Sequence, residues 1–192
     1  MKEELNLYRI VRPFLAFLMR ILFWPTIVGK ENIPVTGKCV LAGTHIYDFD
    51  PILIMACTKR NVYFIAKKEL HDGKLGFIFK AAGTIPVDRS KKNPKARIKA
   101  EEALNNGKLL GIFPEGTTKK EKGILLPFKY GAVSMAQKTN SKIVPFAIIG
   151  EYKLFSKIKI VFDNPIDISC LNLEEANNLL REKVVKLIEN NK

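Results

Sequence analysis

The sequence predicts an α/β fold in which a mixed β-sheet is flanked by helices and preceded by an amphipathic N-terminal helix. Short apolar runs alternate with segments that carry helix start and stop signals from Asn32 onward, which is typical of a sheet covered by helices. The preceding residues form a largely apolar stretch marked by arginines. Of the 192 residues, 47% are hydrophobic and 27% are charged, which suits one domain with a substantial core.

The N-terminal segment, residues 5–28, has its polar side chains on one side of a helical wheel. Its apolar run after Arg12 is interrupted by Arg20 and two prolines, and it is shorter than the roughly 20 residues that span hydrocarbon. The first four residues have no net positive charge, unlike the start of a signal peptide. The polar side chains within an arc of about 120° are those of Asn6, Arg9, Arg12 and Arg20.

We expect residues 1–28 to form a membrane-associating segment that lies in the interface, with its arginines toward the lipid headgroups. The alternative is a helix that packs on the core of the following domain, residues 29–192. The apolar side chains expected to insert are Phe14, Phe17, Leu18 and Trp24.

The rest of the chain divides into six predicted strands and five predicted helices. Asn93, Pro94 and Gly107 punctuate one helix as its N-cap, first residue and C-terminal stop. Asn172 and Glu175 predict a capping box at the start of the last helix. The strands are expected over 39–44, 61–66, 83–87, 109–113, 143–149 and 157–163, and the helices over 51–58, 75–82, 94–106, 128–139 and 173–189.

The net charge of +13 predicts an anionic partner: a phosphate-bearing substrate, an anionic membrane or nucleic acid. The chain lacks zinc-finger spacing and an aromatic-rich RNA-binding consensus, so we expect no nucleic acid partner. Its cysteines, Cys39, Cys57 and Cys170, are odd in number and widely spaced. They predict reduced thiols in a cytosolic environment.

Chemically versatile residues follow the first four predicted strands. His45 follows the first strand, Lys67 the second, Arg89 the third and Glu115 the fourth. Because sites in such sheets cluster where strands give way to loops, we expect these residues to share one rim of the sheet.

His45 and Asp50 form the first candidate pair. They lie five residues apart, about 140° round a regular helix, so they meet only if a loop folds back onto the helix start. A carboxylate that holds the Nδ1–H of a histidine leaves Nε2 free as a base for a hydroxyl. The alternatives are an ordinary loop histidine beside an aspartate that caps the helix before Pro51, or Asp48 as the orienting carboxylate.

Three further stretches carry weaker signals. Arg89 ends the stretch from Gly83, and its planar fork suits phosphate. Gly116 follows the fourth strand and permits a positive φ, so backbone N–H groups can approach a substrate. The strand 143–147 contains Pro145, which places it near a sheet edge or a bulge, and it either packs in the core or lines an acyl groove.

Together and in order, four blocks resemble those of the glycerolipid acyltransferase family, of the bacterial 1-acylglycerol-3-phosphate acyltransferase type. The resemblance covers roughly residues 30–150. Thr44 stands where the family often has asparagine, and Thr118 stands where an arginine often follows the third block. The blocks are His45-x4-Asp50, Gly83 to Arg89, Phe113 to Thr117, and Val144-Pro145.

This resemblance implies transfer of a fatty acyl group from acyl-CoA or acyl-carrier protein to the 2-hydroxyl of 1-acyl-sn-glycerol-3-phosphate (lysophosphatidic acid). The product, phosphatidic acid, serves phospholipid synthesis. The resemblance implies no cofactor and no metal. It also implies a peripheral or monotopic protein at an anionic membrane surface, on the cytoplasmic face of the cell membrane.

The same resemblance assigns roles to seven residues. It implies catalysis by His45, oriented by Asp50, and phosphate binding by Arg89, with Lys67 as a weaker candidate. It implies that the glycerol is positioned by Glu115, Gly116 and Thr117.

Other hypotheses remain open. The acceptor could be glycerol-3-phosphate or another lysophospholipid. A non-catalytic basic domain that binds membranes is a second alternative. The third is a metal-dependent phosphohydrolase that uses His45, Asp48, Asp50, His71 and Asp72.

Overall fold

A computed structural model describes residues 2–73, 76, 84–87, 94–118, 121, 125–153 and 158–191 of the chain. The strands are β1 (Thr26–Val28), β2 (Cys39–Gly43), β3 (Val62–Lys67), β4 (Thr84–Val87), β5 (Leu109–Ile112), β6 (Lys142–Ile149) and β7 (Lys159–Phe162). The helices are α1 (Lys2–Phe23), α2 (Asp50–Cys57), α3 (Lys68–Asp72), α5 (Pro94–Asn105), α6 (Gly131–Lys138) and α7 (Leu173–Glu189), with a 3₁₀ turn over Lys30–Asn32.

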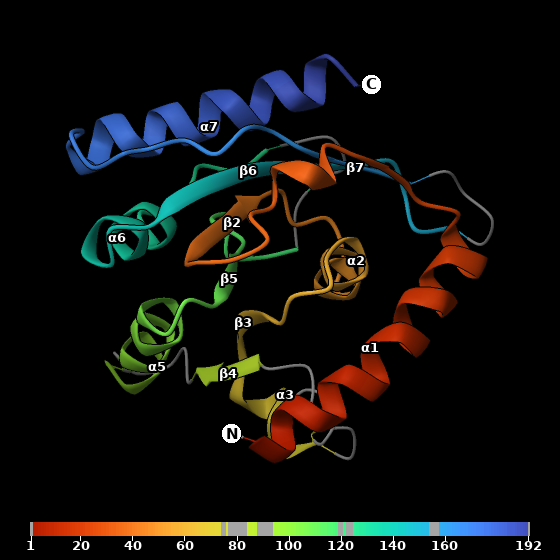
Figure 1. The fold of residues 1–192 in the computed structure, drawn as a ribbon. Helices are drawn as coiled ribbons and strands as arrows, with labels where there is room; N and C mark the ends of the chain where they lie inside the picture. The colour runs from red at the N-terminus through yellow and green to blue at the C-terminus, as the bar shows by residue number, and fades with distance from the viewer. Residues whose placement is uncertain are drawn as a thin grey trace.

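The described strands form one sheet in the order β1-β7-β6-β2-β5-β3-β4. The strands β6, β2, β5, β3 and β4 run parallel to one another, whereas β6 and β7 pair antiparallel and β1 runs parallel to β7. The sheet is therefore mixed, and all six expected strands are present. As Figure 1 shows, α1 and α2 cover one face, and α5, α6 and α7 lie on the other.

Each face of the sheet has its own hydrophobic core. In β2, Cys39 and Leu41 point into the core beneath α1 and α2, whereas Val40 and Ala42 point into the core beneath α5, α6 and α7. Because the parallel strands are buried on both faces, they appear in the sequence as uninterrupted apolar runs.

The punctuation predicted for α5 and α7 is confirmed where the structure describes it. Asn172 and Glu175 form the predicted capping box of α7, and Gly107 adopts a φ of 70° just after α5. Asn93 and most of the expected helix 75–82 lie outside the described residues. Three elements among the described residues were not expected: the short helix α3, the strand β1 within the N-terminal segment, and the 3₁₀ turn over Lys30–Asn32.

The N-terminal helix ends at Phe23, earlier than the end of the expected segment at residue 28. Pro25 lacks a backbone N–H and cannot continue a helix, and the following residues pair with β7 instead. Met19 is buried in the core, and Arg12 Nε donates a hydrogen bond to Met55 O of α2 at 3.0 Å. The expectation that all the arginines point toward headgroups is therefore wrong for Arg12, which faces the domain.

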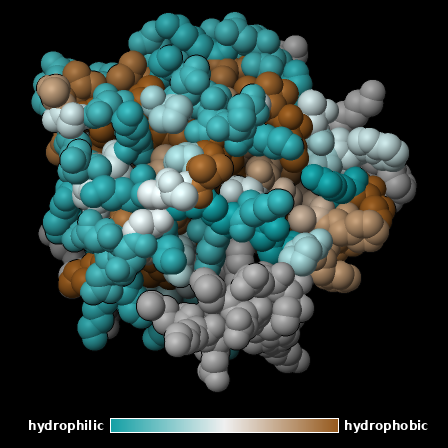
Figure 2. Space-filling view, in the orientation of Figure 1, coloured by the Kyte–Doolittle hydropathy of each residue, from teal (hydrophilic) through white to brown (hydrophobic). Residues whose placement is uncertain are grey.

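The exposed side chains in the second half of α1 are mostly apolar, and Arg20 is exposed among them. In Figure 2, tan and brown side chains gather at the right, where Figure 1 places the second half of α1. Among the described helices, none combines the length and the apolar character required to cross a bilayer. The exposed apolar residues of the helix and its C-terminal end are Phe14, Phe17, Leu18, Ile21 and Trp24.

Pro145 lies inside the sheet, because β6 is flanked by β7 and β2. The expectation of an edge strand is wrong, but the expectation of a bulge is correct. The pairing of Phe146 with Phe162 and of Ile143 with Ile166 differs by one residue in register. Pro145 therefore lies beside an irregular stretch of the ladder, where a missing N–H is tolerated.

Arg60 ties together three turns at the amino-terminal edge of the sheet. Its guanidinium donates to Pro34 O at 2.6 Å, to Gly37 O at 2.5 Å and to Gly107 O at 2.7 Å. These carbonyls belong to the loop before β2 and the turn before β5, while Arg60 itself precedes β3. One side chain thus holds the starts of three neighbouring strands in register.

We predict that Arg60→Met lowers the free energy of unfolding by about 2 kcal/mol, because charge-assisted hydrogen bonds to three carbonyls are lost. Urea unfolding followed by circular dichroism measures this change. The same substitution at Arg181, which is exposed on α7, is the matched control and should change stability far less. Equal effects of the two substitutions would contradict the role given to Arg60.

Candidate active site

The candidate site lies at the carboxyl-terminal edge of the sheet. Because β2, β3 and β5 run parallel, the residues that follow them meet at the same edge. The structure places His45 just after β2, Lys67 at the last position of β3 and Glu115 just after β5. Arg89 and Gly83 lie outside the described residues, and the side chain of Lys67 is likewise outside the description.

His45 and Asp50 are in contact. His45 Nδ1 lies 2.8 Å from Asp50 Oδ2, with the imidazole 16% exposed and the carboxylate fully buried. The contact is possible because His45 lies in the loop before α2, not on the helix. This loop folds back over the first turn of α2, as the spacing of the two residues requires.

The direction of the Asp50 side chain differs from the expected helix cap. Asp50 is the first residue of α2, and the N-cap position is Phe49. Asp50 Oδ2 accepts the backbone N–H groups of Ile46 at 2.7 Å and Tyr47 at 3.0 Å, both in the loop that precedes the helix. The carboxylate therefore closes the loop instead of capping the helix.

These contacts also determine the tautomer of His45. Asp50 Oδ2 already accepts two backbone N–H groups, so it acts as an acceptor toward His45 as well. The proton of the neutral imidazole then lies on Nδ1, and Nε2 keeps its lone pair. His45 is thus arranged as a base through Nε2.

Asp48, the alternative carboxylate, lies elsewhere. It is exposed, and Asp48 Oδ1 accepts a hydrogen bond from Thr118 Oγ1 at 3.4 Å. The loop therefore turns Asp50 toward His45 and Asp48 toward solvent.

Glu115 holds the backbone of the loop. It is 3% exposed, and Glu115 Oε1 accepts the backbone N–H of His45 at 2.9 Å, while Oε2 accepts that of Leu126 at 3.0 Å. The family resemblance implied that Glu115 positions the glycerol. The geometry is that of a buried carboxylate that joins the loop after β2 to the loop after β5.

Phe113 supports the imidazole from one face. The rings of His45 and Phe113 stack with centroids 4.0 Å apart and planes 13° from parallel. Phe113 in turn stacks on Phe64 of β3, with centroids 5.8 Å apart. The sequence showed Phe113 only as part of a motif, since nothing local indicates which ring will lie beneath the histidine.

The turn at Gly116 favours glycine because its φ is 71°, in the left-handed region. The Nζ of Lys129 lies beside this turn, 2.8 Å from where a Cβ of residue 116 would be. Lys129 N donates to Pro114 O at 3.0 Å, which fixes the lysine beside this turn. The structure thus adds the cation of Lys129 to the edge that carries the half-buried Thr117.

Thr44 has a structural role where the related family often has asparagine. Its buried Oγ1 accepts the backbone N–H of Ile148 at 2.7 Å and lies 3.3 Å from Ile148 O. It therefore joins the end of β2 to β6 and leaves the support of His45 to other residues.

Tyr152 is a member of the site that sequence reasoning did not find. Its hydroxyl donates to Asp50 Oδ1 at 2.8 Å. Burial raises the pKa of Tyr152, and the adjacent Asp50 carboxylate raises it further, so the hydroxyl remains a donor. Tyr152 is 102 residues from Asp50 in the chain and belongs to no motif, so only the packing of the two segments reveals the contact.

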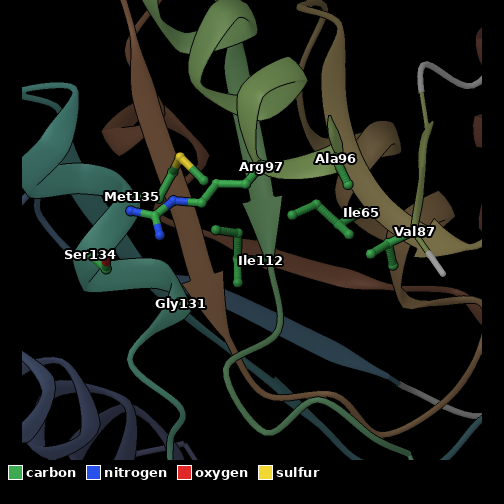
Figure 3. Close-up of a pocket in the computed structure, with 8 residues that line it drawn as sticks. All are labelled: Ile65, Val87, Ala96, Arg97, Ile112, Gly131, Ser134 and Met135. Carbon is green, nitrogen blue, oxygen red and sulfur yellow. The ribbon is translucent and has the colours of Figure 1, made fainter. Parts of the chain in front are cut away.

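A cavity of about 260 Å³ lies on the other face of the sheet, between α5 and α6. Ile65, Val87 and Ile112 of β3, β4 and β5 form its apolar floor. Figure 3 shows Arg97 reaching across from α5 toward Ser134 and Met135 of α6. None of the polar groups that surround His45 lines this cavity, so it is separate from the candidate site.

The residues of the metal hypothesis are not gathered into one site. Within the described ranges, no group of three or more histidine, cysteine, aspartate or glutamate side chains could hold a metal ion. His71 is buried, and its Nε2 lies 2.8 Å from Thr84 Oγ1. The three cysteines are free, and burial raises the pKa of Cys39 and Cys57 to about 12.

Comparison with known proteins gives consistent results. Residues 25–149 match the family described as Acyltransferase. A 1-acyl-sn-glycerol-3-phosphate acyltransferase of Bacillus subtilis (strain 168) is 33% identical over 147 residues, which cover 73% of this chain and 72% of the relative. A protein of the same name from Borreliella burgdorferi is 29% identical over 179 residues, covering 85% of this chain and 71% of the relative.

The fold has a solved counterpart. The crystal structure of the 1-acyl-sn-glycerophosphate (LPA) acyltransferase PlsC from Thermotoga maritima superposes with a TM-score of 0.75 at 24% identity. The match covers 98% of this chain and 78% of that one. The likeness supports the mixed sheet with flanking helices, including the predicted N-terminal helix.

Proposed function

This chain belongs to the acyltransferase family and is an O-acyltransferase, and we propose that its acceptor is the 2-hydroxyl of 1-acyl-sn-glycerol-3-phosphate. The relatives named 1-acyl-sn-glycerol-3-phosphate acyltransferase support the choice of acceptor. The observation that carries the proposal is the His45–Asp50 pair, with Nε2 of His45 left free as a base.

The proposed reaction needs no covalent enzyme intermediate. His45 Nε2 removes the proton of the acceptor hydroxyl, and the oxygen attacks the thioester carbonyl to form a C–O bond. The tetrahedral intermediate collapses, the C–S bond breaks, and the proton passes from His45 to the thiolate. General-base assistance of this kind contributes about 10²–10⁴ in rate.

Asp50 serves the base in two ways in this proposal. It holds the imidazole in the required tautomer, and its negative charge lies 2.8 Å from the imidazolium that forms when Nε2 takes the proton. Glu115 is assigned to the backbone of the His45 loop, because both of its oxygens accept backbone N–H groups.

Cations are needed for the acceptor phosphate. We assign this role to Arg89, supported by Lys67. Lys67 is the last residue of β3, Arg89 comes two residues after β4 in the sequence, and the carboxyl ends of these strands share the edge that carries His45. Lys129 is a further cation at this edge, beside the Gly116 turn. It offers a positive charge beside Gly116, two residues before Thr118, the position at which the related family often has arginine.

The acyl donor is a thioester of CoA or of acyl-carrier protein, since both present the same carbonyl to the acceptor oxygen. Acceptor and product are lipids, which places the proposed reaction at a membrane surface. We assign contact with the bilayer to the outward face of α1, on the cytoplasmic side of the cell membrane. The exposed aromatic and aliphatic side chains of this face are the kind that insert into an interface.

We predict that Asp50→Asn lowers kcat with lysophosphatidate by at least about 10²-fold, because an amide cannot accept from His45, Tyr152 and the loop N–H groups together. His45→Ala should be at least as damaging. Asp48→Asn is the matched control, and it should retain most of the activity because Asp48 faces solvent. Activity is assayed at a temperature below the thermal unfolding midpoint of every variant. Greater damage from Asp48→Asn than from Asp50→Asn would reverse the assignment.

We predict that Arg89→Lys raises the KM for lysophosphatidate about tenfold, because a point charge does not reproduce the bidentate fork. The KM for the acyl donor should stay unchanged. Arg181→Lys on α7 is the control and should alter neither constant. If both KM values rise together, the phosphate role of Arg89 is wrong.

We predict that replacing Phe14, Phe17 and Ile21 together with serine strongly lowers the salt-resistant part of vesicle binding, because these exposed side chains would insert into the bilayer. The electrostatic part, about 1 kcal/mol per nearby Lys or Arg, should persist at low salt and fall as salt is added. Co-sedimentation with phosphatidylcholine vesicles, with and without phosphatidylserine, measures both parts.

A matched triple variant replaces three exposed apolar residues outside α1 with serine: Val35, Ile98 and Leu173. Its vesicle binding should equal that of the native protein. Equal losses in the two triple variants would mean that α1 is not the lipid-binding face.

A further inference from the structure

Tyr152 is the residue outside the sequence motifs that most directly contacts the candidate catalytic pair. We propose that Tyr152 is a positioning residue for Asp50, and through it for His45, and that Phe23 of α1 holds Tyr152 in place. The inference rests on the proposed function, because it concerns turnover at the same site. It adds a link between the N-terminal helix and the catalytic base.

The two oxygens of Asp50 are held unequally. Oδ2 accepts the N–H groups of Ile46 and Tyr47 and contacts His45 Nδ1, whereas the hydroxyl of Tyr152 donates to Oδ1. Among the described residues, Tyr152 is the one that donates a hydrogen bond to Asp50 Oδ1. Asp50 is fully buried, so losing this hydroxyl leaves Oδ1 without its protein partner.

This hydrogen bond has a geometric consequence for the base. A carboxylate rotates about the Cβ–Cγ bond, and holding both of its oxygens fixes that rotation. The direction of Oδ2 then determines the orientation of the imidazole, whose Nδ1 lies 2.8 Å away. Tyr152 therefore acts on Nε2, the atom that takes the proton, without touching the substrate.

The ring of Tyr152 is held by other aromatic rings. The edge contact with Phe23 has a centroid distance of 5.1 Å and an interplanar angle of 88°. Tyr47 and Phe49 of the His45 loop lie at 5.6 Å and 6.3 Å. Phe23 is the last residue of α1, so the helix that exposes Phe14 and Phe17 also supports the ring that holds Asp50.

Packing between α1 and α2 also holds Phe23 and Asp50 in place relative to each other. Met19 of α1 is buried in the core that also contains residues of α2, and Arg12 donates to Met55 O of α2, the helix that begins with Asp50. Both ends of the arrangement, Phe23 on α1 and Asp50 on α2, are thus joined by packing between these helices.

The test compares Tyr152→Phe with native protein in detergent micelles that contain lysophosphatidate and an acyl thioester, so that membrane binding does not limit the rate. The variant keeps the ring and removes the hydroxyl. The expected result is a fall in kcat of about tenfold or more, since the lost hydrogen bond is to a charged group. Both KM values should stay unchanged, which a general structural defect would not produce.

Tyr130→Phe is the matched control. Tyr130 is 50% exposed at the start of α6 and makes no contact with Asp50. This substitution should leave kcat and both KM values unchanged. The unfolding midpoint of each variant is recorded, and rates are compared at a temperature at which all are folded.

The part played by Phe23 is tested by a double-mutant cycle. Phe23→Leu alone should lower kcat about threefold, which corresponds to the free energy that one aromatic pair contributes. In the Tyr152→Phe background the same change should have little effect, because the hydroxyl through which it acts is gone. Additive effects of the two substitutions would overturn the link between α1 and Asp50.

The outcomes separate this inference from the proposed function. If the native protein is active and His45→Ala is inactive, but Tyr152→Phe has an unchanged kcat, the positioning role alone is overturned. Failure of the native protein to acylate lysophosphatidate would overturn the proposed acceptor. A lowered kcat with unchanged KM values in Tyr152→Phe, together with an unaffected Tyr130→Phe, supports the inference.

Discussion

The fully buried carboxylate of Asp50 is the group on which the arrangement of the site depends. Removing a charge from water costs several kcal/mol unless hydrogen bonds and a partner compensate. Here the compensation comes from the loop after β2 and from Tyr152 after β6. The loop, α2 and the end of β6 must all be in place before the hydrogen bonds of this carboxylate are formed. The contacts that stabilise the buried charge therefore also arrange the site.

A second buried carboxylate completes the support of His45. Glu115 accepts the backbone N–H of His45, while Asp50 accepts from the ring, and Phe113 stacks on one face of the imidazole. The position, the tautomer and the tilt of the ring are therefore determined by three different residues. Support from several residues at once holds a general base within the narrow geometry that proton transfer requires.

The helix α1 serves two surfaces at once. Its inward residues, Arg12, Met19 and Phe23, contact α2, the core and Tyr152. The exposed residues of its second half are mostly apolar, with Arg20 among them, which suits the lipid contact that we propose. The two expectations for this segment, association with a membrane and packing on the domain, are thus compatible, because they concern opposite sides of one helix.

The sequence by itself determined the positions of six strands, the capping box of Asn172 and the candidacy of His45 and Asp50 as a pair, because these depend on apolar periodicity, backbone preferences and short spacings; the choice of Asp50 over Asp48 came from the structure. It also placed the residues that follow parallel strands at one edge. Only the tertiary structure decided that Asp50 faces its own loop, that Pro145 lies inside the sheet, and that Glu115 holds backbone. The contact between Tyr152 and Asp50 spans 102 residues, and that between His45 and Glu115 spans 70. Such contacts depend on the order of strands in the sheet, which no local pattern of residues specifies.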